Sequence, residues 1–269
     1  MRMKIINWNI SWLKGIESKA SYLLNLVNSG LFIIILQEVK ENSYQYLKEA
    51  FSDIANIEYS LNYRIPGKYD NDSRKLGVAI IVSKDIQILS ADTLNRTLMP
   101  DRTLFLELKY NDQIIKVMGF HSITGVQHGK AKELQYFSFA EAIDELSPDI
   151  VGIDANEPAV DHYDISQMTF FDNHCKGKGC ASFFNAMAAN GLSDSFVKSY
   201  DINNFVEGQY LTTSHIIKRG NKHVRYDFLF IDEDKFPSYI CSYDYMGAVD
   251  AGSDHAAVIV DIDDWELTM

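Results

Sequence analysis

Cysteine is scarce in this sequence, and its scarcity excludes a small protein held together by disulfides. Only Cys175, Cys180 and Cys241 occur among the 269 residues. Three cysteines are too few, and too odd in number, for a disulfide framework, and no set of cysteines and histidines around them has the spacing of a zinc site. A bridge between Cys175 and Cys180 stays open for an oxidising compartment. Reduced thiols are the preferred interpretation.

Long apolar runs are also lacking. The longest covers residues 31–36, whereas a helix that spans a bilayer needs about 20 apolar residues. The first ten residues, MRMKIINWNI, have neither the apolar segment nor the small-residue cleavage site of a signal peptide. We therefore expect a soluble, cytoplasmic protein with no membrane partner, with secretion open only if a leader was removed. The sequence leaves the oligomeric state open.

Basic residues are outnumbered by acidic ones. The chain has 37 acidic and 25 basic residues, which gives a formal charge of −12. A negative protein repels a polyanion at long range, and this argues against a protein that coats nucleic acid. A nuclease with one local basic strip is still compatible with this charge.

Short runs rich in β-branched and aromatic residues predict strands along the whole chain. They cover residues 4–10, 32–37, 59–64, 77–83, 104–110, 114–120, 150–154, 226–231 and 256–262. Apolar residues three and four positions apart predict helices over residues 18–27, 44–51, 131–146 and 181–189. Runs such as FIIIL are apolar on both faces, so their sheets must be covered on each side by another layer. We expect one layered α/β domain over residues 1–269, with loops at 67–75 and 176–179.

Polar side chains fall at the ends of these runs, where a purely structural strand rarely carries them. Glu38 directly follows one apolar run, and Asp254 stands just before the last one. A carboxylate at the rim of a core strand is partly desolvated, which favours binding of a hard cation. Glu38 and Asp254 are therefore predicted metal ligands.

Other polar residues at strand ends have the types that phosphoester hydrolysis needs. The reaction requires a group that orients and deprotonates water, donors to the phosphate oxygens, and a positioned imidazole. These types are supplied by Asp154, Asn156, Asn9, His121 and His255. Each alone has an ordinary structural explanation, such as a turn or a cap, but the ordered set favours a catalytic site.

The ordered set resembles the endonuclease/exonuclease/phosphatase superfamily, whose fold is DNase I-like. Its landmarks here are Trp8-Asn9, Leu36-Gln37-Glu38, Gly77-Val78-Ala79-Ile80, His121, Gly152-Ile153-Asp154-Ala155-Asn156, Arg225-Tyr226-Asp227-Phe228 and Ser253-Asp254-His255. Each motif alone recurs by chance, but seven in the family's order are jointly specific. The resemblance implies a four-layer α/β sandwich, with two mixed β-sheets packed face to face, helices outside, and a site at one end.

The resemblance also implies a metal site and a general base. Glu38 would bind Mg²⁺, for which Mn²⁺ substitutes, and Asn9 and Asp254 would complete the metal and phosphate environment. Asp154 would orient or deprotonate the attacking water, and Asn156 would hold the phosphate. Attack would be in line, without a covalent enzyme intermediate. For unperturbed carboxylates we expect activity to fall at about pH 4.

Two histidines and one further carboxylate complete the implied set. His255 would contact the scissile phosphate, and Asp227 would bond its other ring nitrogen and fix its tautomer. His121 would donate to the same phosphate from the opposite side. The sequence departs from the family pattern at two places. Ser11 stands where some members of the family have an acidic residue, which puts a second metal site at that position in doubt. His121-Ser122-Ile123 stands where the family often has His-x-Pro, so substrate contacts of this loop do not transfer from relatives.

The substrate is the least determined property. Residues 208–226 contain no acidic residue, and Lys218, Arg219, Lys222 and Arg225 make this stretch a candidate phosphate-binding strip, although a solvated hairpin fits equally. We favour a nuclease that cleaves DNA. A phosphatase or phosphodiesterase for an inositol phosphate or nucleotide, a phospholipid head-group hydrolase, and a catalytically silent scaffold for a phosphorylated partner remain alternatives.

Overall fold

The computed structural model describes residues 2–13, 15–28, 30–63, 75–157, 178–199 and 212–263, with the side chains at 125–129 and 222 left out. Most of the strands in these ranges form two six-stranded sheets. The first has the order β13-β14-β1-β2-β4-β3. Its strands are β1 (Met3–Asn9), β2 (Leu31–Val39), β3 (Ala55–Tyr59), β4 (Gly77–Ser83), β13 (Ile240–Asp244) and β14 (Ala257–Ile262).

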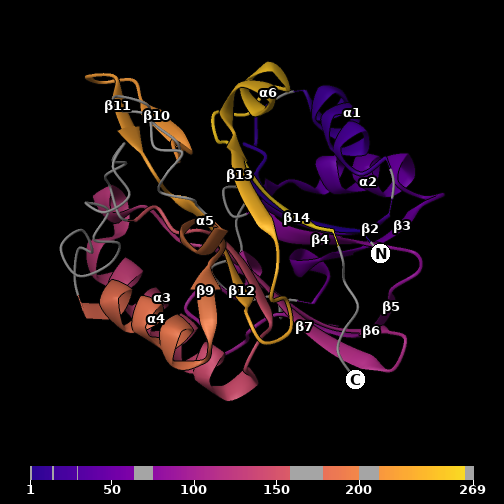
Figure 1. Cartoon of the computed structure of the whole chain (residues 1–269). Coiled ribbons are helices and arrows are strands. Elements are labelled where there is room, and N and C mark those ends of the chain that lie inside the picture. Colours follow the sequence, from indigo (N-terminus) through magenta and orange to yellow (C-terminus); the bar gives the residue numbers. More distant parts are fainter. Residues whose placement is uncertain are drawn as a thin grey trace.

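The second sheet has the order β5-β6-β7-β8-β12-β9. Its strands are β5 (Gln87–Asp92), β6 (Thr103–Tyr110), β7 (Gln113–His121), β8 (Ile150–Asp154), β9 (Leu192–Asp194) and β12 (Asp227–Asp232). A separate two-stranded hairpin consists of β10 (His215–Ile217) and β11 (Lys222–Val224). This hairpin projects from the two large sheets (Figure 1).

Each large sheet is mixed, with one parallel pair among antiparallel ones. In the first sheet β1 runs parallel to β2, and in the second β7 runs parallel to β8. Asn9 stands opposite Gln37 in the first pair, and His121 stands opposite Asp154 in the second. Polar side chains at the carboxyl ends of both pairs are thereby brought to the edges of their sheets.

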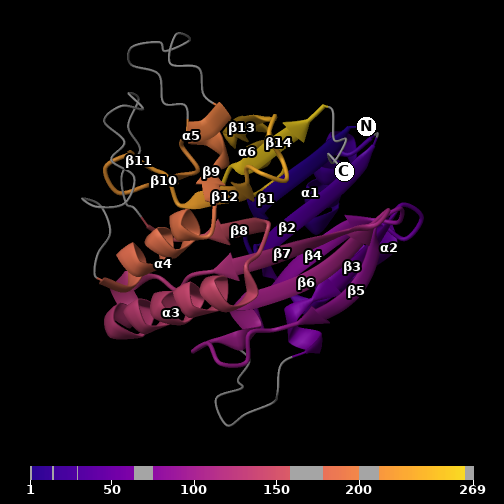
Figure 2. The same cartoon turned by 60° about the horizontal axis from the view of Figure 1, so that its bottom comes forward.

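Helices cover the outer faces of both sheets (Figures 1 and 2). The first sheet packs against α1 (Ile16–Leu26), α2 (Glu41–Ala50) and α6 (Tyr245–Asp250), and the second against α3 (Gly125–Leu146) and α4 (Lys178–Ala189). A third apolar cluster lies between the sheets, where Ile33 and Ile80 of the first sheet and Leu106 of the second are buried. The predicted four-layer sandwich is therefore confirmed.

A polar contact joins the two sheets inside this apolar core. Asn7 Nδ2 donates to the carbonyl oxygens of Ile153 (3.2 Å) and Phe228 (3.1 Å), and Asn7 Oδ1 accepts from Gln37 Nε2 (2.7 Å). A Cβ added at Gly152 would lie 2.5 Å from Asn7 Oδ1. Glycine at this position is what allows β8 to approach β1 so closely.

Most predicted strands and helices are found within a few residues of their expected ends, but some predictions are wrong. The strand expected at 59–64 ends at Tyr59 and is followed by a 3-10 helix, η1 (Ser60–Asn62). The reason is Ser60, whose hydroxyl donates to Asp101 O (2.6 Å) and accepts from Val78 N (2.9 Å). Buried in this way, it turns the chain instead of extending β3.

Several short or edge elements were not predicted from the sequence. These are β5, β9, β13, α6 and the five-residue α5 (Ser195–Ser199), whereas the β10–β11 hairpin lies in the stretch for which a solvated hairpin was one interpretation. The prediction of a loop at 176–179 is wrong at Lys178 and Gly179, because these two residues begin α4. Most of the loop predicted at 67–75 lies outside the described residues. Cys180 and Cys241 are buried, and Cys175 is outside the described part. No helix in the described ranges is long and apolar enough to cross a membrane.

Candidate active site

The predicted catalytic residues meet at one end of the sandwich. Asn9 and His121 end β1 and β7, and Asp154 ends β8. Asp227 begins β12 opposite Asp154, because β12 is antiparallel to β8. The two sheets are joined here by Asn9 Nδ2, which donates to Asp154 Oδ2 at 2.8 Å. Strand direction alone therefore brings residues far apart in sequence to one rim.

Asp154 is the buried carboxylate of this rim. Only 1% of its surface is exposed, and its second oxygen, Oδ1, accepts from the backbone N–H of Asn156 at 3.1 Å. Burial and then the charge of Asp227 raise the pKa of Asp154 to about 7, although the bond from Asn9 lowers it. A carboxylate with a raised pKa is a stronger base than a solvated one, which suits proton abstraction from water near neutral pH.

His255 forms a buried pair with Asp227. The distance from His255 Nδ1 to Asp227 Oδ2 is 2.8 Å, and Asp227 is fully buried. Burial alone would lower the pKa of His255, but the carboxylate of Asp227 outweighs it and raises that pKa to about 10. The ring is then an imidazolium at neutral pH, with Nδ1–H held by Asp227 and Nε2–H free to donate.

Ser253 fixes the turn that carries His255. Its hydroxyl donates to the carbonyl oxygen of Asn9 (2.7 Å) and accepts from the backbone N–H of His255 (3.1 Å). Trp8 Nε1 also donates to His255 O at 3.0 Å. The turn before β14 is thus bonded to the end of β1, and this holds the Asp227–His255 pair beside Asp154.

His121 has a partner that the sequence analysis missed. Arg102, the last residue of η3 (Pro100–Arg102), places Nη1 2.9 Å from His121 Nδ1. A guanidinium cannot accept a hydrogen bond, so Nδ1 accepts and the neutral ring carries its proton on Nε2. Burial first and Arg102 second keep the pKa of His121 well below 6.5. Nε2 lies 3.6 Å from Asp154 Oδ2 and 3.8 Å from Glu38 Oε1, too far for hydrogen bonds.

Glu38 leaves the regular pleat of β2. The register with β4 shifts between Leu36 and Val39, and Glu38 has a positive φ of 58°. Such a backbone is costly for a residue with a side chain and is typical of functional sites. Its carboxylate is partly exposed and accepts from Trp12 N at 3.1 Å. The bulge keeps Val39 in the outer core and turns the charge of Glu38 to the rim.

Two buried lysines near the site were also missed. Lys19 donates to the carbonyl oxygens of Ser11 (2.9 Å) and Leu13 (3.1 Å). Burial lowers the pKa of Lys19, and the charges of Asp254 and Glu38 oppose this shift. Lys132 donates to Asn156 O at 2.8 Å and pairs with the buried Glu157 at 3.1 Å. Nothing in the local sequence pattern distinguishes these lysines from solvated ones.

Asn156 adopts a positive φ of 50° next to Asp154. Its Nδ2 donates to Ser122 O at 3.0 Å. An amide NH₂ carries two hydrogens, so the second can reach a phosphate oxygen. Asn9 is more fully occupied, because its Oδ1 also accepts from Ser11 N at 2.9 Å.

The basic residues of 208–226, which were predicted to bind phosphate, do not lie together in the structure. Arg225 is only 1% exposed, and its Nη2 bonds Asp194 Oδ1 at 2.8 Å while Nε donates to Tyr243 at 2.9 Å. The prediction that Arg225 contacts substrate is therefore wrong, because the guanidinium is used inside the fold. Lys218 and Arg219 are exposed at the tip of the β10–β11 hairpin. The side chain of Lys222 and residues 208–211 lie outside the described part.

Among the described residues, two groups of side chains at this end could hold a metal ion. One consists of Asp154, Asp227 and His255, and the other of His215, Asp254 and His255. Asp254 is the exposed member, with 53% of its side chain accessible. Oδ1 of Asp227 is buried without a hydrogen-bond partner among the described residues. His215 was not predicted, because its place depends on how the hairpin folds back.

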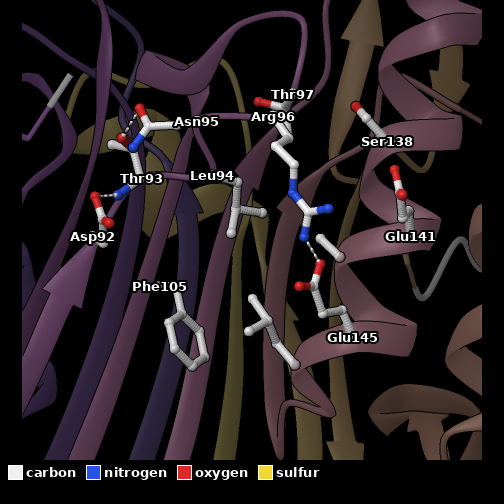
Figure 3. A pocket seen from close by; sticks show the side chains of 12 residues that line it. Asp92, Thr93, Leu94, Asn95, Arg96, Thr97, Phe105, Ser138, Glu141 and Glu145 are labelled. Carbon is white, nitrogen blue, oxygen red and sulfur yellow. Dashed lines mark hydrogen bonds and ion pairs between the residues drawn. The ribbon is translucent and has the colours of Figure 1, made fainter. Parts of the chain in front are cut away.

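A separate cavity of about 280 Å³ lies between the chain after β5 and helix α3 (Figure 3). Leu94 and Phe105 line its apolar side, and Arg96 pairs with Glu145 across it. None of the predicted site residues lines it. The cavity is therefore not the predicted active site.

Comparison with known proteins finds similarity in structure but not in sequence. No protein-family model matches the chain, and no curated protein matches it. The structure resembles a variant of the 3′ phosphatase NExo from Neisseria bound to a product DNA hairpin, with 18% identity, a TM-score of 0.66 and coverage of 97% of this chain and 99% of that one.

Two further structures resemble it over nearly the whole chain. TDP2 from D. rerio, complexed with a single-strand DNA product, has 17% identity and a TM-score of 0.62, and the match covers 98% of this chain and 99% of that one. The human Nocturnin catalytic domain with a bound sulfate anion has 13% identity and a TM-score of 0.63, with coverage of 97% and 93%. The chain shares with these proteins the DNase I-like sandwich fold.

Proposed function

We propose that this chain is a divalent-metal-dependent phosphoesterase that hydrolyses phosphodiester bonds of DNA. The observation that carries the proposal is the Asp227–His255 pair, at 2.8 Å, beside the buried base Asp154 and the rim carboxylate Glu38. An imidazolium, a carboxylate of raised pKa and an acidic rim are the components that in-line hydrolysis of a phosphoester requires.

The side chains of the site fit a hard cation. Glu38 would hold Mg²⁺ or Mn²⁺, and Asp254 would complete the oxygen ligands. Oδ1 of Asp227, buried without a hydrogen-bond partner among the described residues, offers a further carboxylate oxygen nearby. Asn9 would position Asp154 next to the metal with one amide hydrogen, and its second amide hydrogen would donate to a phosphate oxygen, as in Asn156. When bound, the ion supplies positive charge that neutralises the phosphate oxygens.

The side chains of the site would transfer the proton of the attacking water and donate hydrogen bonds to the phosphate. Asp154 orients the attacking water and takes its proton. His255 donates Nε2–H to a phosphate oxygen, and Asp227 stabilises the charge of the ring. His121 donates Nε2–H from the other side, because Arg102 occupies Nδ1, and Asn156 donates its second amide hydrogen. No group of this set forms a bond to phosphorus.

DNA is the preferred substrate for two reasons. Two proteins with this fold were captured with DNA products, a single strand on D. rerio TDP2 and a hairpin on NExo. The exposed Lys218 and Arg219 on the β10–β11 hairpin offer local positive charge to a strand that enters the site. The cytoplasmic location expected from the sequence is part of the same proposal.

The test is a substrate panel with Mg²⁺ or Mn²⁺. It includes plasmid DNA, single-stranded DNA, RNA, nucleotides, inositol phosphates and a phospholipid, each with wild type and with His255→Ala. We expect metal-dependent cleavage of DNA that the variant lacks. Turnover confined to a nucleotide, an inositol phosphate or a lipid would reject the nuclease assignment, and no turnover of any phosphoester would support a silent scaffold.

A further inference from the structure

Three side chains, His215, Asp254 and His255, converge beside the active site. His215 has no role in the proposed hydrolysis, whereas Asp254 and His255 do. His215 on β10 forms an isolated antiparallel bridge with His255. The two imidazole rings lie 4.7 Å apart between centroids and are tilted by 33°. One ligand atom each from His215, Asp254 and His255 lies within 4.8 Å of the other two. His215 also stacks on Tyr226, at 6.0 Å between centroids.

Both histidines have Nδ1 engaged by an oxygen atom, which leaves Nε2 as the ring nitrogen available to a ligand. His215 Nδ1 lies 2.9 Å from the backbone oxygen of Asp254, which can only accept, so Nδ1 carries the hydrogen and Nε2 the lone pair. His255 Nδ1 is held by Asp227 at 2.8 Å. A carboxylate or a backbone carbonyl behind each imidazole is the usual support of metal-bound histidines.

We propose that His215, Asp254 and His255 bind a borderline transition-metal ion such as Zn²⁺. Two imidazoles and one carboxylate with an open position suit zinc, whereas Mg²⁺ prefers oxygen ligands only. The exposed carboxylate of Asp254 leaves the ion open to solvent and substrate. This ligand set shares Asp254 with the predicted magnesium site but is centred on the imidazoles and not on Glu38.

Zinc at these residues would inhibit the enzyme, and this consequence rests on the proposed function. His255 can bind the ion only through Nε2, the atom proposed to donate to the phosphate. A ring nitrogen that binds the ion cannot also donate a hydrogen bond, so the phosphate would lose its contact with His255. Zinc would also compete with Mg²⁺ for Asp254.

The binding experiment titrates Zn²⁺ into the metal-free full-length protein by calorimetry, with the visible absorption of Co²⁺ as a coordination readout. His215→Phe keeps a ring in contact with Tyr226 and His255 but has no nitrogen ligand. His223→Phe is the matched control, because His223 lies in the same hairpin and bonds Thr213 instead. We expect one ion per chain and at least roughly tenfold weaker binding in His215→Phe only.

Two results would overturn the site: no zinc binding by wild type, or binding that His215→Phe leaves unchanged. Asp254→Asn is the second variant, because Asp254 is exposed and its exchange leaves the core intact. We expect it to weaken zinc binding as well, and unchanged affinity would exclude the carboxylate from the ligand set. Thermal melts confirm that each variant is folded.

The activity arm measures the zinc concentration that halves the Mg²⁺-dependent rate of each protein. We expect His215→Phe to need roughly tenfold more zinc than wild type, each relative to its own uninhibited rate. Zinc that binds at His215 without slowing hydrolysis would support the site and count against the role of His255 at the phosphate. The two proposals can therefore fail separately.

Discussion

At the scale of single residues, the site depends on controlling where protons are. Asp227 keeps a proton on His255, Arg102 keeps one off Nδ1 of His121, and burial makes Asp154 basic. The three groups contribute a cation, a neutral donor and a base within one rim. Their different protonation at one pH is what general acid–base catalysis requires.

Arg102 is predicted to act as a positioning residue through His121. In Arg102→Met the bond to Nδ1 is lost, so the imidazole can adopt either tautomer, and kcat/KM should fall by about 10–100-fold. Arg102→Lys, which keeps a donor, should recover part of the loss. Nitrogen NMR shifts of His121 report the tautomer directly, and an unchanged tautomer in Arg102→Met would contradict this role.

The pH profile should reflect the buried base. Asp154 acts only when unprotonated, and its pKa is raised to about 7, so the rate should fall as pH drops through about 7. For Asp154 the fall is therefore expected at a higher pH than the value of about 4 that unperturbed carboxylates would give, because burial disfavours its charged form.

Asn9→Ala tests whether Asp154 sets the acid limb of the pH profile. The amide hydrogen of Asn9 favours the carboxylate form of Asp154, so its removal should raise the pKa and move the acid limb of kcat/KM to higher pH. Asn62→Ala is the control, because the side chain of Asn62 donates to the hydroxyl of Tyr44 and not to Asp154. A limb that moves to lower pH in Asn9→Ala would contradict the assignment of Asp154 as base.

At the scale of elements, the close approach of β1 and β8 sets the geometry of the rim. Gly152→Ala places a methyl group against Asn7 Oδ1 and Ile35 Cδ1. We expect a loss of about 1–3 kcal/mol in the free energy of unfolding, measured by denaturant titration. In an Asn7→Ala background the same exchange should cost less, because the space is open. Strictly additive costs would show that the two residues do not press on each other.

The β10–β11 hairpin is predicted to contribute charge to substrate binding. The double variant Lys218→Gln/Arg219→Gln should have a higher KM for DNA. The slope of the logarithm of the DNA-binding constant against the logarithm of the salt concentration should become shallower by about one unit for each charge removed. Lys48→Gln with Lys84→Gln removes two exposed charges from the first sheet and its helix as the control. If the two double variants raised KM for DNA equally, the hairpin would have no special role in binding the strand. The same conclusion would follow if Lys218→Gln/Arg219→Gln impaired hydrolysis of a small chromogenic phosphodiester as much as that of DNA.

At the scale of the whole molecule, the sequence predicted the layers better than the edges. Buried strands such as β4 and β8 match their predicted ranges. A short, continuous apolar run is typical of a strand in a sheet that is covered on both faces, so the ends of the run mark the ends of the strand. β5 was missed because its residues alternate between exposed and partly exposed positions at the sheet edge. Strands of three residues, such as β9, give too short a pattern to recognise.

The site was predicted where residues belong to strand ends and missed where they arrive through tertiary packing. Asp154 and His121 end long apolar strands. Arg102 reaches His121 because β6 and β7 form a hairpin in which Thr103 pairs with Phe120, a register set by the turn after Tyr110. Pairing the two strands across that turn would have found Arg102. Arg225 was misassigned because a buried arginine and a substrate-binding one have the same local sequence.

The central claim is that Asp154, His255 and a divalent metal hydrolyse phosphodiesters at this rim. The most direct measurement is the Mg²⁺-dependent kcat/KM on a labelled DNA strand for wild type, Asp154→Asn, His255→Gln and the double variant. We predict cleavage by wild type, a loss of at least about 100-fold in each single variant, and a double variant little worse than either. Wild-type rates in either single variant, or cleavage that persists without divalent metal, would contradict the account.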